Sequence, residues 1–435
     1  MRFTSRTLLL LCLAPITAAL GLLHPSFLIF SWVWPVFLIG LAVLDLICAR
    51  RVPLSITRTL PDSLTQGVKA KIILKVKNLS TDSFRLGIVD QPPLEFNVSS
   101  CFLQTRCPPG TLSTLQYEVQ SQERGEFEWK NLYYWVEGPL GLARHIRQGQ
   151  SGVPTQLRVF PKLHAESGVQ LEATRRKQAM LGQKWIRRLG EGREFESLRN
   201  YTRDDDYRWI DWKGVAKHNR LIVRQYQAER NQRVLILLDA GRFMLSKVGD
   251  LTKLDYAIEA ALSLTRLAIQ HGDMVGILVF DSEIRGWIAP HRSSQLLPQM
   301  SDLLRKIKGQ RLESNYALAC AQAARRSTRR TLMVCFTEVH EHATLLVRAM
   351  SSLYPRHLPL CVTMADADLY RASFQVPNTP SEAYHVTAAV ELWENYQQTL
   401  RLLEGWKVLT VHALADSYCS SLLDRYLNIK GRGLL

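Results

Sequence analysis

Two long apolar runs at the N-terminus constrain this chain most, because few folds can hold such runs in water. The runs read RTLLLLCLAPITAALGLL and SFLIFSWVWPVFLIGLAVLDLIC, and only His24 and Pro25 separate them. A membrane-spanning helix needs about 17–25 apolar residues to cross about 30 Å of hydrocarbon. We therefore expect residues 1–51 to form a transmembrane helical hairpin. The alternative is a cleaved signal peptide followed by a single span.

The charges that flank these runs predict how the hairpin is oriented. Arg2 and Arg6 precede it, Arg50 and Arg51 follow it, and the connection contains no Lys or Arg. The positive-inside rule then places both ends in the cytoplasm, so the protein is expected to be multi-pass with cytoplasmic soluble domains. Asp45, near the end of the second run, is expected at the membrane interface rather than on a proton path.

The excess of basic residues narrows the choice of partners. The net charge is +16, from 55 Lys and Arg against 39 Asp and Glu. Such an excess suits nucleic acid, an anionic membrane surface or an acidic partner. The basic residues are spread along the chain, with clusters that include RRSTRR at 325–330. We expect lipid headgroups rather than nucleic acid to meet these clusters.

Cysteine usage points to a reducing compartment. The eight cysteines form no CxxC pair and have no zinc-site spacing. Several lie inside apolar runs, where free cysteine packs as a small hydrophobic residue. The pattern argues against a disulfide framework.

Residues 52–164 have the pattern of short strands. VKAKIILKVKN alternates apolar and charged residues, and STLQYEVQ and KNLYYWVEG do likewise, with turn-forming stretches between them. This spacing predicts a small antiparallel β-sandwich. It contains no catalytic constellation, so we interpret it as a spacer or interaction module.

Residues 165–231 form a connecting segment rich in charged and aromatic side chains. Its centre reads YTRDDDYRWIDWKGVAKHNRLIVRQY. The acids lack the spacing of an EF-hand loop, and no nucleophile is obviously paired with them. Pairing of carboxylates with arginines against aromatic walls is the favoured interpretation, and a partner-docking surface is the second. The partner-docking candidates are Asp205, Asp206, Arg208, Asp211 and Trp212 here, together with Asp239 and Arg242 in the following domain.

Residues 232–435 alternate buried strands with amphipathic helices, which predicts an α/β domain with a doubly wound parallel sheet. RVLILLD is the first strand, and IRGWIA is expected to be a short edge strand. Ligands of such sheets bind beyond the carboxyl ends of the strands. Asp239, Asp281 and Glu338 each follow a strand end. Nucleotide-binding glycine motifs and the GxSxG elbow are absent.

A strand that ends in aspartate, an amphipathic helix and a strand with an edge strand resemble the von Willebrand factor type A fold. The stretches YTRDDDYRWIDWKGVAKHNRLIVRQYQ, ERGEFEWKNLYYWVEGPLGLARH and YLNIKGRGLL resemble the domain-of-unknown-function 58 family over nearly the whole length. The resemblance implies a bacterial inner-membrane protein associated with MoxR-type AAA+ ATPases. It implies no established enzymatic activity.

The type A fold often holds a metal-ion-dependent adhesion site, whose first loop reads Asp-x-Ser-x-Ser. Asp239 matches the aspartate, but Gly241 and Phe243 stand in place of the two serines. The second loop offers Ser314 instead of threonine, and the third has Glu338 instead of aspartate. The resemblance therefore implies an altered Mg²⁺ site with Asp239, Ser314 and Glu338 as candidate ligands, and we expect no bound cofactor.

Arg242 suggests a substitute for the metal. Its guanidinium, in the same loop as Asp239, is hypothesised to pair with a carboxylate there. The expected function is a non-enzymatic adaptor, fixed to the membrane, that docks a MoxR-type AAA+ ATPase in assembly or remodelling of other proteins. The alternative is a metal-dependent envelope hydrolase that uses the strand-end site around Asp239.

Overall fold

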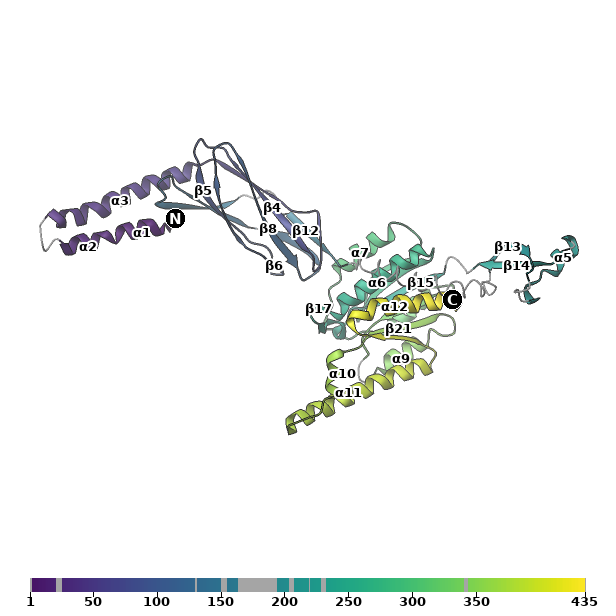
Figure 1. Ribbon diagram of the computed structural model, residues 1–435. Helices are drawn as coiled ribbons and strands as arrows, with labels where there is room; N and C mark the ends of the chain where they lie inside the picture. Colours follow the sequence, from purple (N-terminus) through teal and green to yellow (C-terminus); the bar gives the residue numbers. More distant parts are fainter. Residues whose placement is uncertain are drawn as a thin grey trace. The chain divides into compact units, whose positions relative to one another are not determined.

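The computed structural model describes most of the chain (Figure 1). The described residues are 2–20, 26–129, 131–149, 155–162, 194–202, 207–218, 220–227, 232–339 and 343–434. The chain divides into two compact units, Met1–Lys162 and Leu163–Leu435. Each unit is described by itself.

Three apolar helices open the first unit: α1 (Ser5–Leu11), α2 (Leu13–Leu20) and α3 (Ser26–Arg51). Within the described residues, one helical stretch, Ile29–Arg51, is long and apolar enough to cross a membrane. The other apolar stretch is shorter, Ser5–Ala19. At about 1.5 Å per residue it falls short of about 30 Å of hydrocarbon. The expected pair of spanning helices is therefore reduced to one candidate.

The surface of α3 is apolar rather than amphipathic. Trp32 is 79% exposed, Val36 is 70% exposed and Ile29 is 69% exposed. A core helix of a water-soluble protein would bury such side chains. An exposed helix that is apolar all round suits a lipid environment.

The rest of the first unit consists of three sheets with one shared apolar core. Two of them have the orders β1-β11-β10-β5-β7 and β2-β4-β8-β6, and their strands pair antiparallel as expected. In the third, β3-β12-β9, β3 and β12 run parallel, which departs from the antiparallel prediction. The strand bounds are β1 Arg2–Phe3, β2 Leu54–Thr59, β3 Ser63–Thr65, β4 Lys69–Asn78, β5 Phe84–Asp90, β6 Phe96–Val98, β7 Phe102–Cys107, β8 Leu112–Ser121, β9 Gly125–Trp129, β10 Leu132–Glu137, β11 Ala143–Gly149 and β12 Thr155–Phe160.

A hairpin precedes the α/β sheet in the second unit. Strands β13 (Glu194–Asn200) and β14 (Ile222–Gln227) pair antiparallel. Between them lie a short 3-10 helix, η2 (Tyr207–Trp209), and α5 (Trp212–His218). The charged and aromatic stretch is thus carried on a β-hairpin with a helical tip.

The main sheet of the second unit has the order β19-β18-β15-β20-β21-β22. All strands run parallel except β19, which pairs antiparallel with β18 at the edge. The parallel sheet and its edge strand are confirmed. The bounds are β15 Arg233–Asp239, β18 Met274–Phe280, β19 Ile284–His291, β20 Leu332–Phe336, β21 Leu358–Met364 and β22 Leu409–Ala413, with a two-residue ribbon of β16 Lys247–Val248 and β17 Leu251–Thr252 beside them.

Helices cover both faces of this sheet (Figure 1). Alternate residues of β15 point to opposite faces. One face packs on α6, α7 and α12, and the other packs on α8, α9 and α11. A further helix, α10, was not predicted. The bounds are η3 Arg242–Leu245, α6 Lys253–Gln270, α7 Leu296–Lys306, α8 Tyr316–Arg326, α9 Thr344–Ser351, α10 Ala367–Ser373, α11 Pro380–Gly405 and α12 Ala415–Gly431.

Candidate functional site

Asp239 lies at the carboxyl end of β15 and is 1% exposed. Its Oδ1 accepts hydrogen bonds from the Gly241 backbone N–H at 2.8 Å and from the Ser314 hydroxyl at 2.5 Å. Its Oδ2 accepts from the Thr337 hydroxyl at 2.7 Å and from the Tyr316 hydroxyl at 3.3 Å. Four donors from three loops therefore surround one buried carboxylate.

These donors oppose the effect of burial on the carboxyl group. Removal from water raises the pKa of Asp239, and the hydrogen bonds from Ser314, Thr337, Gly241 and Tyr316 act to lower it. The net direction is upward, since burial is the larger effect. Hydrogen bonding therefore only partly offsets the cost of burying this charge.

Gly241 is required by the close approach of Ser314. A Cβ atom at Gly241 would lie 2.0 Å from the Ser314 Oγ and 3.0 Å from the Leu312 carbonyl oxygen. A serine cannot occupy this position unless the 312–314 loop moves. The side chain of a serine at position 241, as in the type A motif, and the Ser314 hydroxyl would therefore compete for the same space beside Asp239.

Glu338 is held by a lysine. The Lys253 Nζ lies 2.9 Å from the Glu338 Oε1, and the two side chains are 7% and 13% exposed. Lys253 opens α6, whose N-terminus is fixed by a capping box between Thr252 and Asp255. Burial raises the pKa of Glu338 to about 7, although the nearby ammonium of Lys253 lowers it. The candidate third metal ligand is therefore already paired with a cation from the protein.

The carboxylate nearest to the Arg242 guanidinium is an exposed one and not that of Asp239. Its guanidinium is 4.0 Å from the carboxylate of Glu313, with side-chain exposures of 52% and 71%, and it lies over the Phe243 ring at 4.6 Å. Asp239 receives neutral donors instead. The residue that supplies a buried cation to this edge of the sheet is Lys253, not Arg242.

Asp281, the third strand-end acid, fixes the neighbouring loops. Its carboxylate accepts from the Glu283 backbone N–H at 2.9 Å and from the Arg285 Nε at 2.7 Å. Its carbonyl oxygen accepts from the Asn315 N–H at 2.8 Å. Asp281 therefore ties the loop after β18 to the start of α8, where Ser314 and Tyr316 reach Asp239.

This chemistry does not fit the divalent-cation site that the type A resemblance implies. Mg²⁺ demands several open oxygen ligands in near-octahedral geometry. Here the Asp239 oxygens are engaged by donors, Gly241 carries no hydroxyl, and Glu338 is neutralised by Lys253. Among the described residues no group of three or more His, Cys, Asp or Glu side chains is placed to hold a metal ion.

Only some of the docking candidates that precede the sheet in sequence are among the described residues. Asp205 and Asp206 lie outside the described residues, as does the side chain of Arg208. The Asp211 carbonyl oxygen accepts from the Val215 N–H at 2.8 Å as α5 begins, and Trp212 is 65% exposed. Of this set, Trp212 therefore presents a large apolar surface to the outside.

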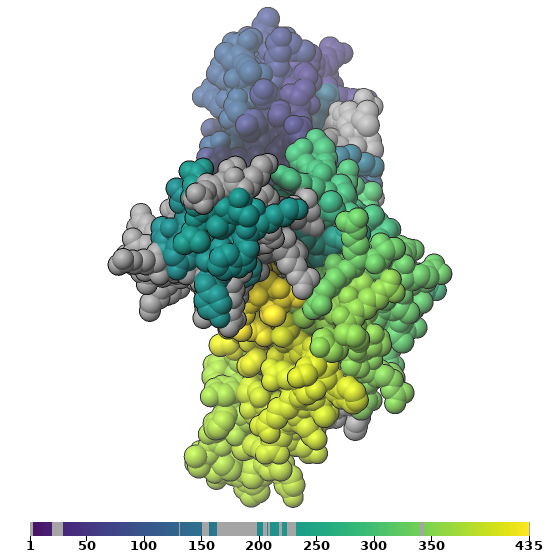
Figure 2. Space-filling model, turned by 90° about the vertical axis from the view of Figure 1, so that its right-hand side faces the viewer, coloured from purple at the N-terminus to yellow at the C-terminus, as the bar shows by residue number. Residues whose placement is uncertain are grey.

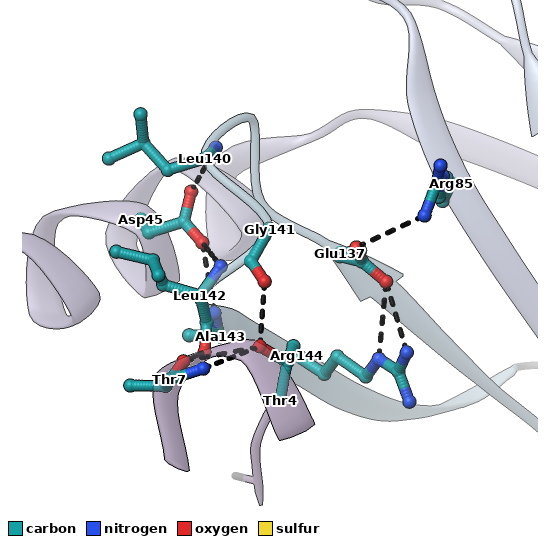
Figure 3. A network of polar contacts seen from close by, with 10 residues as sticks. All are labelled: Thr4, Thr7, Asp45, Arg85, Glu137, Leu140, Gly141, Leu142, Ala143 and Arg144. Carbon is teal, nitrogen blue, oxygen red and sulfur yellow. Dashed lines mark hydrogen bonds and ion pairs between the residues drawn. The ribbon is translucent and has the colours of Figure 1, made fainter. Parts of the chain in front are cut away.

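Sequence reasoning missed a second polar cluster, at the base of α3 (Figure 3). Asp45 is 1% exposed, and its Oδ1 accepts from the Leu140 N–H at 2.8 Å. Its Oδ2 accepts from the Leu142 N–H at 2.8 Å and the Ala143 N–H at 2.9 Å. A Cβ at Gly138 would lie 2.3 Å from the Asp45 carboxylate. The turn-forming EGPLG stretch was the available signal, since it wraps around this carboxylate.

The start of α1 contacts the same turn. The Thr4 hydroxyl donates to the Gly141 carbonyl oxygen at 2.7 Å, and the Thr7 hydroxyl donates to the Leu142 carbonyl oxygen (Figure 3). Beside them, Glu137 pairs with Arg144 at 3.1 Å. Both ends of the apolar N-terminal region therefore meet one turn of the sheet domain.

Comparison with known proteins finds a family model that matches part of the second unit. Residues 197–370 match the family model described as "Protein of unknown function DUF58". The DUF58 match includes the hairpin tip with Trp212, the Asp239 loop, Lys253 and Glu338. A search of curated proteins finds no match.

Solved structures are only distantly similar to this chain. BatB from Bacteroides thetaiotaomicron is 14% identical with a TM-score of 0.33, covering 46% of this chain and 98% of its own. Native alpha-2-macroglobulin from Escherichia coli is 18% identical with a TM-score of 0.20, covering 25% of this chain and 16% of its own. A PapD-like domain of human CEP192 is 12% identical with a TM-score of 0.18, covering 24% of this chain and 82% of its own.

Proposed function

We propose that this DUF58 protein is a membrane-anchored, cytoplasm-facing adaptor that binds a protein partner. By family resemblance the partner is a MoxR-type AAA+ ATPase, and the complex acts in assembly or remodelling of other proteins. The proposal combines an apolar N-terminal helix with a soluble α/β domain that offers binding surface.

The observation that carries this proposal is an exposed aromatic surface on α10 and α11. The rings of Tyr370 and Phe374 are 5.0 Å apart, and Tyr370 lies 5.2 Å from Trp393. Phe374 is 68% exposed and Tyr384 is 80% exposed. Figure 1 shows α10 beside α11, whose free end extends past it. Exposed apolar clusters of this kind mark sites of protein interaction.

The strand-end site supports binding over catalysis. Asp239 is saturated by donors that hold the loops of β15, β20 and α8 together, so it acts as a positioning residue. Arg242 is exposed in that loop and, with Trp212, is our candidate for direct partner contact. The metal-dependent hydrolase remains the alternative, and it requires an open metal ligand set beside Asp239.

Contacts of the turn at 138–143 favour an N-terminal region that stays part of the protein rather than one that is cleaved as a signal peptide. Thr4 and Thr7, near the start of α1, bond to the turn that also binds Asp45 near the end of α3. The Trp34 Nε1 donates to the Leu10 carbonyl oxygen at 3.0 Å, which joins α3 to α1. If α3 enters the bilayer, α1 and α2 must return to the same side. We therefore propose a hairpin with both ends cytoplasmic rather than a cleaved signal peptide.

The strand order supports assignment of the sheet to the von Willebrand type A fold. The first strand, β15, lies in the middle of the sheet between β18 and β20, and the edge strand β19 is antiparallel. The first strand carries Asp239 at its carboxyl end, as the resemblance implies. We propose the type A-like fold on this topology together with the altered loop residues.

Capture of partners from detergent-solubilised membranes tests the proposal. The tagged full chain is expected to retain an AAA+ ATPase, and the Phe374→Ala/Tyr384→Ala variant is expected to lose most of it. Leu94→Ala is the matched control, because Leu94 is an apolar side chain of the first unit that is 100% exposed. Absence of any AAA+ protein from the captured material would contradict the proposed partner. Equal capture by both variants would contradict the proposed surface.

A further inference from the structure

Three loops meet at the edge of the α/β sheet where its strands begin, opposite the edge that carries Asp239. They precede β20, β21 and β22, which are neighbours in the sheet. Two of the loops are joined directly, since the Leu358 N–H donates to the Thr331 carbonyl oxygen at 3.0 Å. The three loops therefore form one continuous surface.

Exposed basic and aromatic side chains dominate this surface. The segments 325–331, 352–357 and 406–407 contain no Asp or Glu. Two acids lie near these segments. Asp273, which precedes β18, is engaged by Lys430 at 2.6 Å, and the exposed Glu404, in the last turn of α11, accepts from the Thr410 hydroxyl at 2.6 Å. We call the exposed basic and aromatic residues of the end of α8 and of these three loops the amino-edge patch. They are Arg325, Arg326, Arg329, Arg330, Tyr354, Arg356, Trp406 and Lys407. The Arg326 guanidinium lies over the Trp287 ring at 4.7 Å.

The aromatic members of the amino-edge patch are unusually open to solvent. Trp406 is 61% exposed and Tyr354 is 44% exposed. Lys407, beside Trp406, has a φ of 64°, so the chain turns sharply from α11 into β22 at this point. Exposed indole and phenol rings beside arginines are the side-chain set that settles at the headgroup level of membranes.

The amino-edge patch lies on the side of the domain where α12 ends. Lys430, in the last turn of α12, pairs with Asp273 at the start of β18. The C-terminus is labelled at this side in Figure 1, and Figure 2 turns it toward the viewer, with the yellow C-terminal residues near the centre of the face.

We propose that the amino-edge patch binds the surface of an anionic phospholipid bilayer. Each guanidinium group can bind two phosphate oxygens at once. The arginines before β20 and β21, with the Lys407 ammonium before β22, match a flat array of headgroups. The exposed Trp406 and Tyr354 rings enter the interfacial layer. The chain itself supplies the reason for lipid as the occupant, because it carries a candidate membrane helix, α3, in its first unit.

Binding by this edge also orients the domain. The carboxyl edge, with Arg242 and the Asp239 loop, is the opposite edge of the same sheet. It faces away from the bilayer when the amino-edge patch lies on it. The domain then holds its other end toward the cytoplasm, where a protein partner can reach it.

Quenching of Trp406 fluorescence in bilayer nanodiscs tests this proposal with the full chain. The quencher is a lipid with a spin label on its headgroup, and the Trp406 signal is the difference between the chain and its Trp406→Phe variant. Nanodiscs of phosphatidylcholine are compared with nanodiscs that contain about 30% phosphatidylglycerol. We expect quenching to be at least about twofold greater with phosphatidylglycerol and to be lost in about 0.5 M NaCl.

Charge reversal distinguishes the patch from the general charge of the protein. Arg329→Glu/Arg330→Glu is expected to abolish the extra quenching. Lys247→Glu/Lys308→Glu makes the same change in net charge at exposed positions near the carboxyl edge, and it is expected to keep the quenching. Equal quenching in both lipid compositions, or equal loss in both variants, would overturn the proposal. So would displacement of the patch from the bilayer by duplex DNA at physiological salt, which would make nucleic acid the ligand.

Discussion

The Lys253 ammonium and the Glu338 carboxylate form a buried ion pair, 2.9 Å apart, at the carboxyl edge of the sheet. They come from the start of α6 and from the segment after β20. Glu338 stands where the type A resemblance expects a metal-ligating aspartate. Lys253 thus brings to this edge a positive charge that belongs to the protein, and it ties a helix start to a strand end.

Removal of the lysine is expected to destabilise the protein. Lys253→Met leaves Glu338 as an unpaired carboxylate in a buried site, which costs about 3 kcal/mol at a pH where the acid is ionised. Chemical denaturation in detergent measures the loss. The Lys253→Met/Glu338→Gln double variant should recover most of it, because neither charge then remains. Arg371→Ala is the control, since the Arg371–Asp368 pair is exposed and should contribute little. A double variant no more stable than Lys253→Met would contradict this account.

The raised pKa of Glu338 predicts a pH dependence of stability. The pKa is about 7 in the folded chain against an ordinary value of 4.5, so the folded state holds this proton more tightly. Stability from this group is therefore fully present at low pH and is lost as the pH rises between these two values. The loss is at most about 3 kcal/mol. Denaturation midpoints of Glu338→Gln should lack this component. An unchanged slope in the variant would assign the dependence to other groups.

Gly241 offers a test of how the Asp239 loop is packed. Gly241→Ala should destabilise by about 1–3 kcal/mol, because the new Cβ would lie 2.0 Å from the Ser314 Oγ. In a Ser314→Gly background the same change should cost much less. Gly405→Ala is the control, since a Cβ there meets nothing within 4 Å. Equal costs in both backgrounds would show that Ser314 is not the obstacle.

The sequence predicted what depends on local pattern. The run RVLILLD reads as a strand buried on both faces, and the structure shows β15 between two helical layers. The pairing of Lys253 with Glu338 was not predictable in this way, because Lys253 reads as an ordinary polar position at a helix start. Only the sheet topology brings it to the end of β20. Thr337 and Tyr316 were missed as donors to Asp239 for the same reason.

Local pattern also missed short elements. The first apolar run was expected to span the bilayer, and within the described residues its apolar helical stretch is Ser5–Ala19. Helix α10 has seven residues, too few for a periodic signal, and β1 has two. Asp45 was expected at the membrane interface rather than on a proton path, and its position relative to a bilayer stays a prediction. Its actual partners are backbone N–H groups distant in sequence, which a single-sequence pattern does not reveal.

Divalent cations should leave the protein unchanged. With the Asp239 oxygens engaged by donors and Glu338 paired with Lys253, the residues that the structure describes at this edge leave Mg²⁺ or Mn²⁺ no open ligand set. The melting temperature in about 5 mM Mn²⁺ is expected to match that in chelator, because only a ligand that binds the folded state stabilises it. Specific Mn²⁺ binding that disappears in Asp239→Ala would contradict this and would favour the hydrolase alternative.

The Asp45 carboxylate is expected to fasten α3 to the sheet domain. It accepts three backbone hydrogen bonds from the 140–143 turn while almost wholly buried. Asp45→Asn keeps the size but removes the charge and puts an N–H₂ group against backbone donors, so about 3 kcal/mol of stability should be lost. Thermal unfolding of the full chain in detergent measures it.

Two further variants decide whether that loss comes from the turn. Gly138→Ala should produce a similar effect without touching the charge, because its Cβ would lie 2.3 Å from the Asp45 carboxylate and 2.6 Å from the Asp45 carbonyl oxygen. Asp62→Asn, at an exposed acid of the same unit, should have little effect. If Gly138→Ala is neutral while Asp45→Asn destabilises, the carboxylate acts through contacts other than this turn. If both destabilise, the turn is what couples the candidate membrane helix to the sheets. A movement of α3 would then displace the turn and its strands as well.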